Sequence, residues 1–281
     1  MTQQPLLVIG GTGITGSRVV TRLRARGAEV RVGSRSGTPP FVWQDRATWD
    51  PVLGGARAVY VVPLDGALLT RPLVERAVEL GVPRIVLLSG RGVDVPGYAP
   101  ETSALGATHV DGEAAVRASG VAWTIVRPGW FAQNFSEGFL RDDVLAGELR
   151  LPGGDGAASF VDAEDIADVA VAALTEEGHA GRIYELSGPR ALTLEEAAGE
   201  IAEATGRPVR YVPLTVEEYT SHLTAQGWSP GDARDAADAV APLRRDLDSH
   251  LSHGVREALG REPGDFSAFV KEAVRQGAWG G

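Results

Sequence analysis

The sequence predicts an α/β fold in which helices cover both faces of a doubly wound parallel sheet. Two observations support this fold class. Short apolar runs, typical of strands buried on both faces, alternate with helical patterns from the N-terminus to about residue 186. The first run, Leu6–Ile9, passes through spaced glycines into a helix whose apolar side carries Val19, Val20 and Leu23. Because such alternation builds βαβ units, a ligand is expected at the carboxyl ends of the strands.

The glycine-rich turn after the first strand has the pattern of a dinucleotide-binding site. Gly10 and Gly11 permit a tight turn, and Gly13 lets the backbone approach a pyrophosphate. Gly16 lets the helix pack closely on the strand. The start of the helix offers free N–H groups and a partial positive charge to phosphates. The sequence therefore predicts a Rossmann-type fold that binds a dinucleotide; a glycine turn without a ligand is the alternative.

The remaining elements follow in order along the chain. Further strands of the sheet are expected at 30–33, 41–43, 58–62, 84–88 and 122–126, with helices at 67–80 and 103–119. After residue 134, short strands are expected at 149–151, 159–161, 182–186 and 209–212, and helices at 162–174 and 194–205. Asp162 and Thr193 are the expected N-caps of these two helices. Residues 215–276 are expected to be helical, with a break at 227–231.

These elements predict one NAD(P)-binding domain that spans residues 1–281. Its Rossmann core is expected to cover about residues 1–186. Residues 130–160 and 187–281 are expected to form a smaller, mainly helical substrate-binding region that caps the ligand cleft.

Composition narrows the partners and the chemistry. A net charge of −10 argues against a nucleic-acid or membrane-surface partner and says little else about partners. The chain has no cysteine, so disulfides, thiol catalysis and thiolate metal sites are excluded, and no metal site is predicted. The N-terminal residues show neither a signal peptide nor a membrane span, so a cytoplasmic location is expected.

The end of the second strand indicates which dinucleotide is bound. An acidic residue there would bind the ribose 2′-hydroxyl of NAD, but this chain has Ser34, Arg35 and Ser36. An arginine between two hydroxyls suits a 2′-phosphate, so NADP(H) is the predicted cofactor. An exposed arginine in a turn is the alternative. Asp45 is a candidate contact of the adenine or, alternatively, a helix N-cap.

Several further stretches carry a family resemblance. They are Ser89-Gly90, residues 123–131 with Asn134, residues 160–167 and residues 184–189. Together with residues 8–16, they resemble the atypical short-chain dehydrogenase/reductases, specifically the NmrA-like branch. Residues 41–43 with Thr48-Trp49, and residues 277–279, are similar to the ergot-alkaloid reductase subgroup.

The resemblance implies an NADP(H) site and assigns residues to it. Those it places at the pyrophosphate are Gly10, Thr12, Gly13, Ile14, Thr15 and Gly16. Arg35 would bind the 2′-phosphate, and Val62 and Pro63 would lie along the adenosine. The nicotinamide would be flanked by Ser89, Gly90, Pro128 and Gly129. Trp130, Phe131 and Asn134 follow the last strand of this series, so they are expected to line the substrate pocket, with core packing as the alternative.

The sequence differs from the archetypal family members in its catalytic residues. Those members use Tyr-x-x-x-Lys on a helix, whereas no tyrosine here has a lysine four residues on, and Lys271 is the only lysine. His109 and Glu113 instead share a helix face, and a carboxylate beside an imidazole would raise its pKa and suit a proton donor. A plain helix-surface pair is the alternative. Tyr98 is a second candidate donor, or an ordinary loop aromatic.

Two functions from different classes fit these features. The first is an NADPH-dependent oxidoreductase that reduces a small organic substrate: an imine or iminium, a quinone-like compound or a carbonyl. Without a Tyr/Lys pair, it should prefer acceptors that need little enzymatic acid. The second is a non-catalytic NADP(H)-binding sensor that acts through a protein partner.

Overall fold

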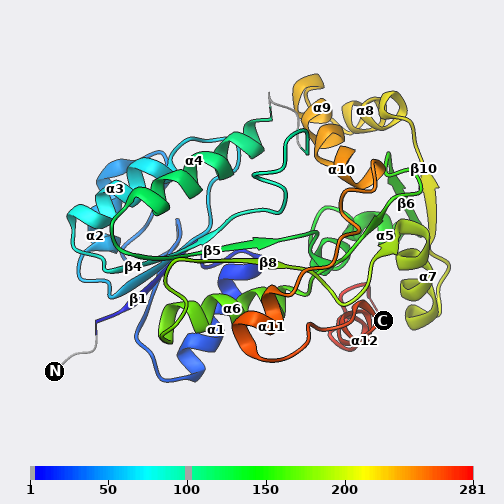
Figure 1. The fold of residues 1–281 in the computed structure, drawn as a ribbon. Helices are drawn as coiled ribbons and strands as arrows, with labels where there is room; N and C mark the ends of the chain where they lie inside the picture. The colour runs from blue at the N-terminus through cyan, green and yellow to red at the C-terminus, as the bar shows by residue number, and fades with distance from the viewer. Residues whose placement is uncertain (1–3, 99–102, 281) are drawn as a thin grey trace.

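The computed structural model describes residues 4–98 and 103–280, and it has the expected doubly wound architecture (Figure 1). Six parallel strands form the central sheet in the order β2-β1-β3-β4-β5-β8. They are β1 (Leu6–Ile9), β2 (Val30–Gly33), β3 (Ala58–Val61), β4 (Arg84–Leu88), β5 (Ala122–Pro128) and β8 (Arg182–Leu186). The chain adds strands on opposite sides of β1, so the carboxyl ends of β1 and β3 form the switch point at which such sheets bind ligands.

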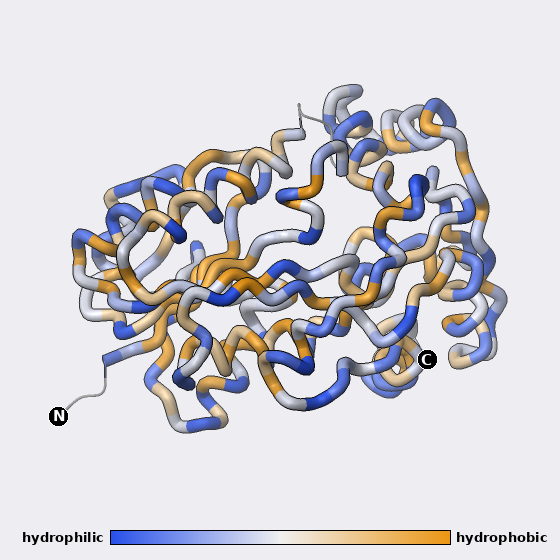
Figure 2. Tube along the Cα trace, in the orientation of Figure 1, coloured by the Kyte–Doolittle hydropathy of each residue, from blue (hydrophilic) through white to orange (hydrophobic). Residues whose placement is uncertain are grey.

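Helices cover both faces because the strands expose apolar side chains alternately. Leu6 and Val8 of β1 belong to one buried cluster, whereas Leu7 and Ile9 belong to the other. The first cluster is covered by α1 (Ile14–Ala25), α6 (Ala163–Thr175) and α11 (Gly254–Leu259). The second is covered by α2 (Trp49–Leu53), α3 (Thr70–Glu79) and α4 (Ala104–Ala118). Figure 2 shows the central strands as the most hydrophobic part of the trace.

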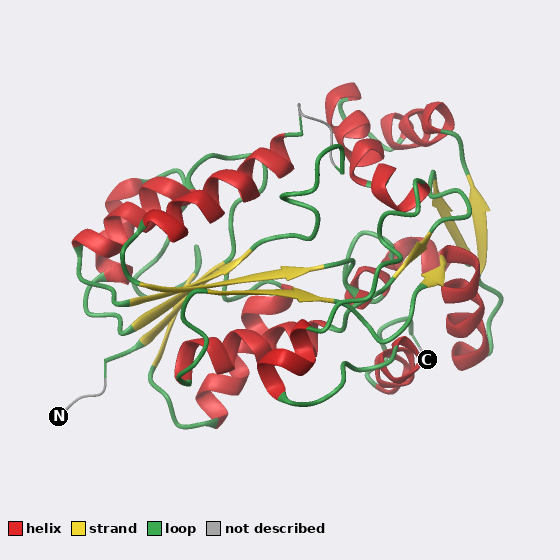
Figure 3. Cartoon of the chain, viewed as in Figure 1, coloured by secondary structure: helices red, strands yellow, loops and turns green. Residues whose placement is uncertain are grey.

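A separate hydrophobic core lies beyond the carboxyl ends of β5 and β8 (Figure 3). At its centre, the ring of Phe135 packs 5.1 Å from Phe160 and 5.4 Å from Phe266, measured between centroids. Two small sheets, β10-β6 and β7-β9, accompany the helices of this region. Its elements are η2 (Ala132–Phe135), α5 (Arg141–Ala146), β6 (Glu148–Leu151), β7 (Ala157–Ala158), β9 (Leu192–Thr193), α7 (Leu194–Thr205), β10 (Arg210–Pro213), α8 (Val216–Ala225), α9 (Pro230–Ala239), α10 (Ala241–Arg244) and α12 (Phe266–Arg275).

The predicted helix starts at Asp162 and Thr193 are confirmed. The Asp162 carboxylate accepts from the Glu164 N–H at 2.9 Å and caps α6. Thr193 and Glu196 form a reciprocal capping box at the start of α7, which ends at Gly206 in the left-handed conformation. Within the described part of the chain, no helix combines the length and apolarity needed to cross a membrane.

The expected strand at 41–43 is wrong. Side chains take the place of a strand partner at Val42: the Thr48 hydroxyl accepts from the Val42 N–H at 3.0 Å, and the Trp49 indole donates to the Val42 carbonyl at 3.2 Å. Phe41 and Trp43 pack edge to face at 5.2 Å over the buried Trp49. A short helix, η1 (Arg46–Thr48), follows, and β2 remains the edge strand on this side of the sheet.

The expected helical cap over residues 215–276 is only partly correct. Residues 245–253 form a non-helical segment between α10 and α11. Helix α11 does not join the cap, because Val255 packs with α6 and β8 in the Rossmann core. Residues 159–161 are reduced to one isolated bridge between Phe131 and Val161, beside the two-residue strand β7.

Candidate functional site

The turn between β1 and α1, which we call the cradle, combines close glycine contacts with N–H groups that no side chain caps, the arrangement typical of a dinucleotide-binding turn. Gly10 has a φ of +75°, and a Cβ on Gly16 would lie 2.2 Å from the Gly10 carbonyl oxygen, so both glycines have the structural roles expected of them. Gly13 differs, because a Cβ there would meet only that carbonyl oxygen, at 3.5 Å. Among the described residues, no side chain caps the N–H groups at the start of α1. Open space over free N–H groups fits a bound phosphate.

The side chains around this cradle divide into exposed and inward-facing ones. Thr12 is exposed and Ile14 is half-buried. The Thr15 side chain is buried, and its hydroxyl accepts from the Tyr60 hydroxyl at 3.1 Å. Thr15 can therefore offer a phosphate its backbone N–H, whereas its hydroxyl serves the packing of α1 on β3.

The segment after β2 leaves one cation free for a ligand. Arg35 is exposed, and it joins none of the ion pairs found in residues 4–98 and 103–280. The hydroxyl oxygens of Ser34 and Ser36 lie 3.4 Å apart beside it. Asp45 caps η1 by accepting from the Ala47 N–H at 3.1 Å, which is the alternative that the sequence left open.

Backbone pairing brings the other expected cofactor segments together at the sheet edge. Val62 packs against Gly10, where a Cβ would lie 2.8 Å from the Val62 Cβ, and Pro63 follows in a buried position. Beyond β4, the Arg91 N–H donates to the Pro128 carbonyl at 3.0 Å, which places Gly90 beside Pro128. The Gly129 N–H donates to the Leu186 carbonyl at 2.9 Å.

His109 of α4 turns its ring toward this edge. A Cβ built on Gly90 would lie 3.5 Å from Cδ2 and 3.6 Å from Nε2 of the imidazole. Its Nδ1 atom is buried and has no hydrogen-bond partner in the described part of the structure. Burial lowers the pKa of His109 below its ordinary 6.5, and the opposing carboxylates of Asp65 and Glu113 do not restore it. The expected raised pKa is wrong, and the ring is neutral at pH 7.

Glu113 is not the hydrogen-bond partner of His109. Its carboxylate forms a buried bidentate pair with Arg127, whose Nε and Nη2 donate at 2.7 Å each. Ser89 and Arg117 donate to the same carboxylate at 2.7 and 2.8 Å. Burial by itself would raise the pKa of Glu113, but the hydrogen bonds from Arg127 and Ser89 outweigh it and hold this pKa below 4.5. The Ser89 hydroxyl is therefore engaged with Glu113. Only the backbone of Ser89 remains to contact a ligand at the carboxyl ends of the strands.

Tyr98 is also engaged within the protein, because its hydroxyl donates to the buried carboxylate of Asp248. Burial raises the pKa of Tyr98, and the negative charge of Asp248 raises it further, so Tyr98 holds its proton toward Asp248. Trp130 donates from its indole to the same carboxylate at 3.1 Å. Sequence reasoning did not connect Asp248 with Tyr98 or Trp130. The buried Arg127 left one visible signal, a charge within the apolar run of β5.

The residues expected to line a substrate pocket have different environments. Trp130 is half-buried between Phe139 and Phe160, at centroid distances of 6.0 and 6.4 Å. Phe131 packs against the Rossmann core, so the alternative expected from the sequence, core packing, holds for this residue. Asn134 is half-buried in η2, and its backbone N–H donates to the Phe131 carbonyl at 3.1 Å.

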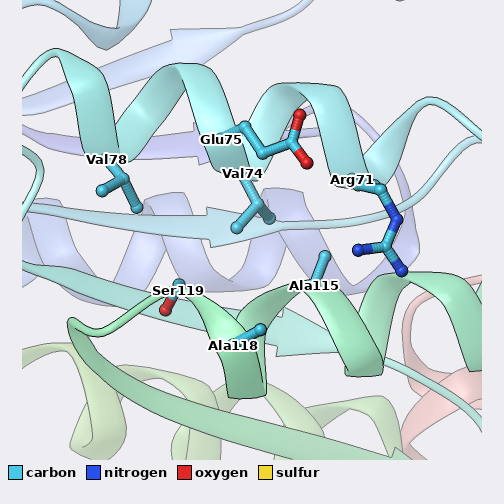
Figure 4. Close-up of a pocket in the computed structure, with 7 residues that line it drawn as sticks. All are labelled: Arg71, Val74, Glu75, Val78, Ala115, Ala118 and Ser119. Atoms are coloured by element: carbon cyan, nitrogen blue, oxygen red, sulfur yellow. The ribbon is translucent and has the colours of Figure 1, made fainter.

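Two hollows lie away from this edge. Figure 4 shows one between α3 and α4, lined by Arg71, Val74, Glu75, Val78, Ala115, Ala118 and Ser119. The other lies between α8 and α9. No three His, Cys, Asp or Glu side chains in residues 4–98 and 103–280 are grouped so as to hold a metal ion.

The fold and the cradle define a class: Rossmann-type proteins that bind NAD(P). Residues 42–177 match a family described as NAD(P)H-binding. The chain is 34% identical to the NAD(P)H azoreductase of Xenophilus azovorans, over 95% of this chain and 96% of that protein. It is 30% identical to agroclavine dehydrogenase of Claviceps fusiformis, over 95% of this chain and 96% of that protein.

Solved structures share the fold. The quinone oxidoreductase QOR2 of Escherichia coli, complexed with NADPH, superposes with a TM-score of 0.77 at 22% identity, over 96% of this chain and 99% of that one. NmrA, a negative transcriptional regulator in complex with NAD, superposes with a TM-score of 0.74 at 15% identity, over 97% and 95% of the two chains. The protein belongs to the NmrA-like atypical short-chain dehydrogenase/reductases, and its azoreductase and dehydrogenase relatives place it among the NAD(P)H-dependent oxidoreductases.

Proposed function

We propose that this protein is an NADPH-dependent reductase of a small organic acceptor: an imine or iminium, a quinone-like compound or a carbonyl. The observation that carries the proposal is the position of His109, whose Nε2 edge faces Gly90 at the sheet edge that also holds the open glycine cradle. A polar ring beside the expected nicotinamide position suits an enzyme. Relatives named as an azoreductase and a dehydrogenase support the same reaction class.

Exposed apolar side chains in the neighbouring loops support an acceptor site. Leu68, Val95 and Phe139 are 59, 51 and 57% exposed, and they follow β3, β4 and β5 respectively. Exposed apolar side chains in the connections that leave the carboxyl ends of strands are typical of a site for a small organic molecule. We place the acceptor between the Rossmann core of about residues 1–186 and the region formed by residues 130–160 and 187–281, as parts of one domain.

NADPH is proposed over NADH because of Arg35. Its guanidinium is exposed next to two serine hydroxyls, and within the described residues no carboxylate pairs with it. A guanidinium bound to a 2′-phosphate by two charge-assisted hydrogen bonds is worth about tenfold or more in affinity. The ribose of NADH offers Arg35 no charge to pair with.

The residues of the chain divide the work of such a reaction. The glycine turn and the N–H groups of α1 would bind the pyrophosphate, and NADPH, when bound, supplies a hydride. Gly90 and Pro128 would orient the reactive ring. A neutral His109 can donate a hydrogen bond from Nε2 to an acceptor atom that gains electron density, but it is a weaker acid than an imidazolium. Acceptors that need little acid, such as an iminium or a quinone, should therefore react faster than a ketone.

Turnover with a matched set of acceptors tests this function. NADPH oxidation is followed at 340 nm with a quinone, an iminium and a ketone of similar size, and repeated with NADH. We expect turnover of the quinone or the iminium and a slower reaction of the ketone. The preference for NADPH over NADH is also measured in Arg35→Ala. Arg24→Ala is its control, because Arg24 is another exposed arginine. Tight NADPH binding without turnover of any acceptor would contradict a reductase and support the non-catalytic sensor.

A further inference from the structure

Residues 245–253, which we call the strap, run from α10 to α11 past the carboxyl ends of β5 and β8 (Figure 1). Ser252 fastens the strap to the segment at the end of β8: its N–H donates to the Ser187 hydroxyl at 2.9 Å, and its hydroxyl donates to the Glu185 carbonyl at 2.7 Å. The contact is close, since a Cβ on Gly254 would lie 2.2 Å from the Glu185 oxygen. The strap is therefore anchored to the Rossmann core at its C-terminal end.

Asp248, in the middle of the strap, joins two other segments. Its side chain is 1% exposed. One carboxylate oxygen accepts from the hydroxyl of Tyr98, and the other accepts from the indole Nε1 of Trp130 at 3.1 Å. The backbone carbonyl of Asp248 accepts from the Ser159 N–H at 3.1 Å and from the Arg91 guanidinium at 3.3 Å. Both the carboxylate and the carbonyl of this buried residue are thus occupied by groups of other segments.

The loop of residues 91–98, between β4 and α4, is held against the strap at both ends. Arg91 donates to the His250 carbonyl and to the Ser159 hydroxyl, the latter at 3.0 Å. Arg245 donates to the Gly97 carbonyl at 2.6 Å. Within the loop, the Tyr98 ring lies on Gly92, where a Cβ would come within 2.3 Å of it. Tyr98 is consequently fixed by the loop on one side and by Asp248 on the other.

These contacts border the place proposed for the acceptor. Trp130 directly follows the Pro128-Gly129 segment, and residues 91–98 directly follow Gly90, against which His109 lies. Both polar hydrogens point at Asp248, and Tyr98 and Trp130 are half-buried, so the parts of their rings that remain exposed offer an acceptor apolar surface. Two aromatic rings held in this way suit a flat, unsaturated molecule.

We infer that Asp248 is a positioning residue that holds Tyr98 and Trp130 as two walls of a site for planar, unsaturated acceptors. The inference rests on the proposed reductase function. Asp248 touches neither the cradle nor the acceptor; it acts by fixing the two aromatic side chains. Removing its hydrogen bonds should weaken acceptor binding and leave cofactor binding unchanged.

Asp248→Asn tests the inference, because an amide has one accepting oxygen and can accept from Tyr98 or from Trp130 but not from both, and it carries no charge. We expect the KM for a planar quinone to rise about tenfold, the factor that one charge-assisted hydrogen bond is worth, with kcat changed much less and the NADPH Kd unchanged. Tyr98→Phe should raise the same KM, and the effect of the double variant should be smaller than the sum of the two single effects, because both changes weaken the same Tyr98–Asp248 hydrogen bond.

Ser252→Ala is the matched control. It removes a hydrogen bond that anchors the same strap, yet Ser252 contacts neither Tyr98 nor Trp130 in the hydrogen bonds of the described residues. It should lower thermal stability and leave the KM unchanged. An equal rise of KM in Ser252→Ala would overturn the inference, because general loosening of the strap would then explain the effect.

Hydrogen exchange gives a second measurement that does not depend on turnover. In Asp248→Asn, amide exchange in residues 91–98 should become faster than in the wild type and in Ser252→Ala. Unchanged exchange together with an unchanged KM would refute the role of Asp248. If the wild type reduces no acceptor, the proposed function fails, and hydrogen exchange alone then supports or overturns the positioning role.

Discussion

Replacing Glu113 with glutamine should destabilise the fold by about 3–5 kcal/mol, because it leaves a buried arginine without its charge partner. Arg127 and Glu113 are 2 and 3% exposed. Asp94 and Glu185 also approach Nη1 of Arg127, at 2.8 and 3.5 Å, but their side chains are 59 and 36% exposed. These solvated carboxylates can offset only part of the loss.

Urea and thermal unfolding measure this change. At about 2 °C per kcal/mol for a chain of this size, the Tm should fall by about 6–10 °C. Glu177→Gln is the surface control: Glu177 pairs with Arg84 at 2.8 Å, but its side chain is 93% exposed, so the expected loss is below about 1 kcal/mol.

The effect of pH gives the prediction a sign. Because the folded-state pKa of Glu113 lies below 4.5, the stabilisation from its ionised form is fully present above the unfolded-state pKa and is lost as the pH falls through the folded-state pKa. The stability difference between wild type and Glu113→Gln should be constant near neutral pH and shrink in acid. A loss of stability below about 1 kcal/mol at pH 7, or a loss that stays the same when the pH is lowered into the acid range, would refute the reasoning.

Three further outcomes are expected. Gly16→Ala should unfold more easily than wild type, since its Cβ would lie 2.2 Å from the Gly10 oxygen. Gly13→Ala should fold normally and bind NADPH more weakly. Equal stability of the two variants would contradict this expectation. Arg35→Ala should lose about tenfold or more in NADPH affinity and none for NADH in calorimetric titrations, and parallel losses would remove the 2′-phosphate contact. His109→Gln should lower kcat for a ketone more than for an iminium, and any limb of the wild-type pH–rate profile that belongs to His109 should lie below pH 6.5.

Local sequence patterns were sufficient for most of the Rossmann core. The strand ranges 30–33, 84–88 and 182–186, the helix 194–205 and the caps at Asp162 and Thr193 agree with the structure, because each depends on residues adjacent in the chain. The glycine turn belongs to the same group, since the positive φ of Gly10 and the close approach of Gly16 to the Gly10 oxygen both arise within residues 10–16. The strand at 41–43 failed because Thr48 and Trp49 capture its backbone, a competition that an apolar run does not reveal.

The tertiary structure alone decided the chemistry at the sheet edge. Helical spacing showed that His109 and Glu113 share a face, but not that this face is buried, and burial is what lowers the pKa of His109. Arg127, on strand β5, forms the ion pair with Glu113 of α4. Asp248 accepts a hydrogen bond from Tyr98, which is 150 residues away in the chain. Local patterns constrain which residues share a face or a turn. The partner of a buried charge depends on which distant segments the fold packs beside it, because only a contact made in three dimensions can offset the cost of removing that charge from water.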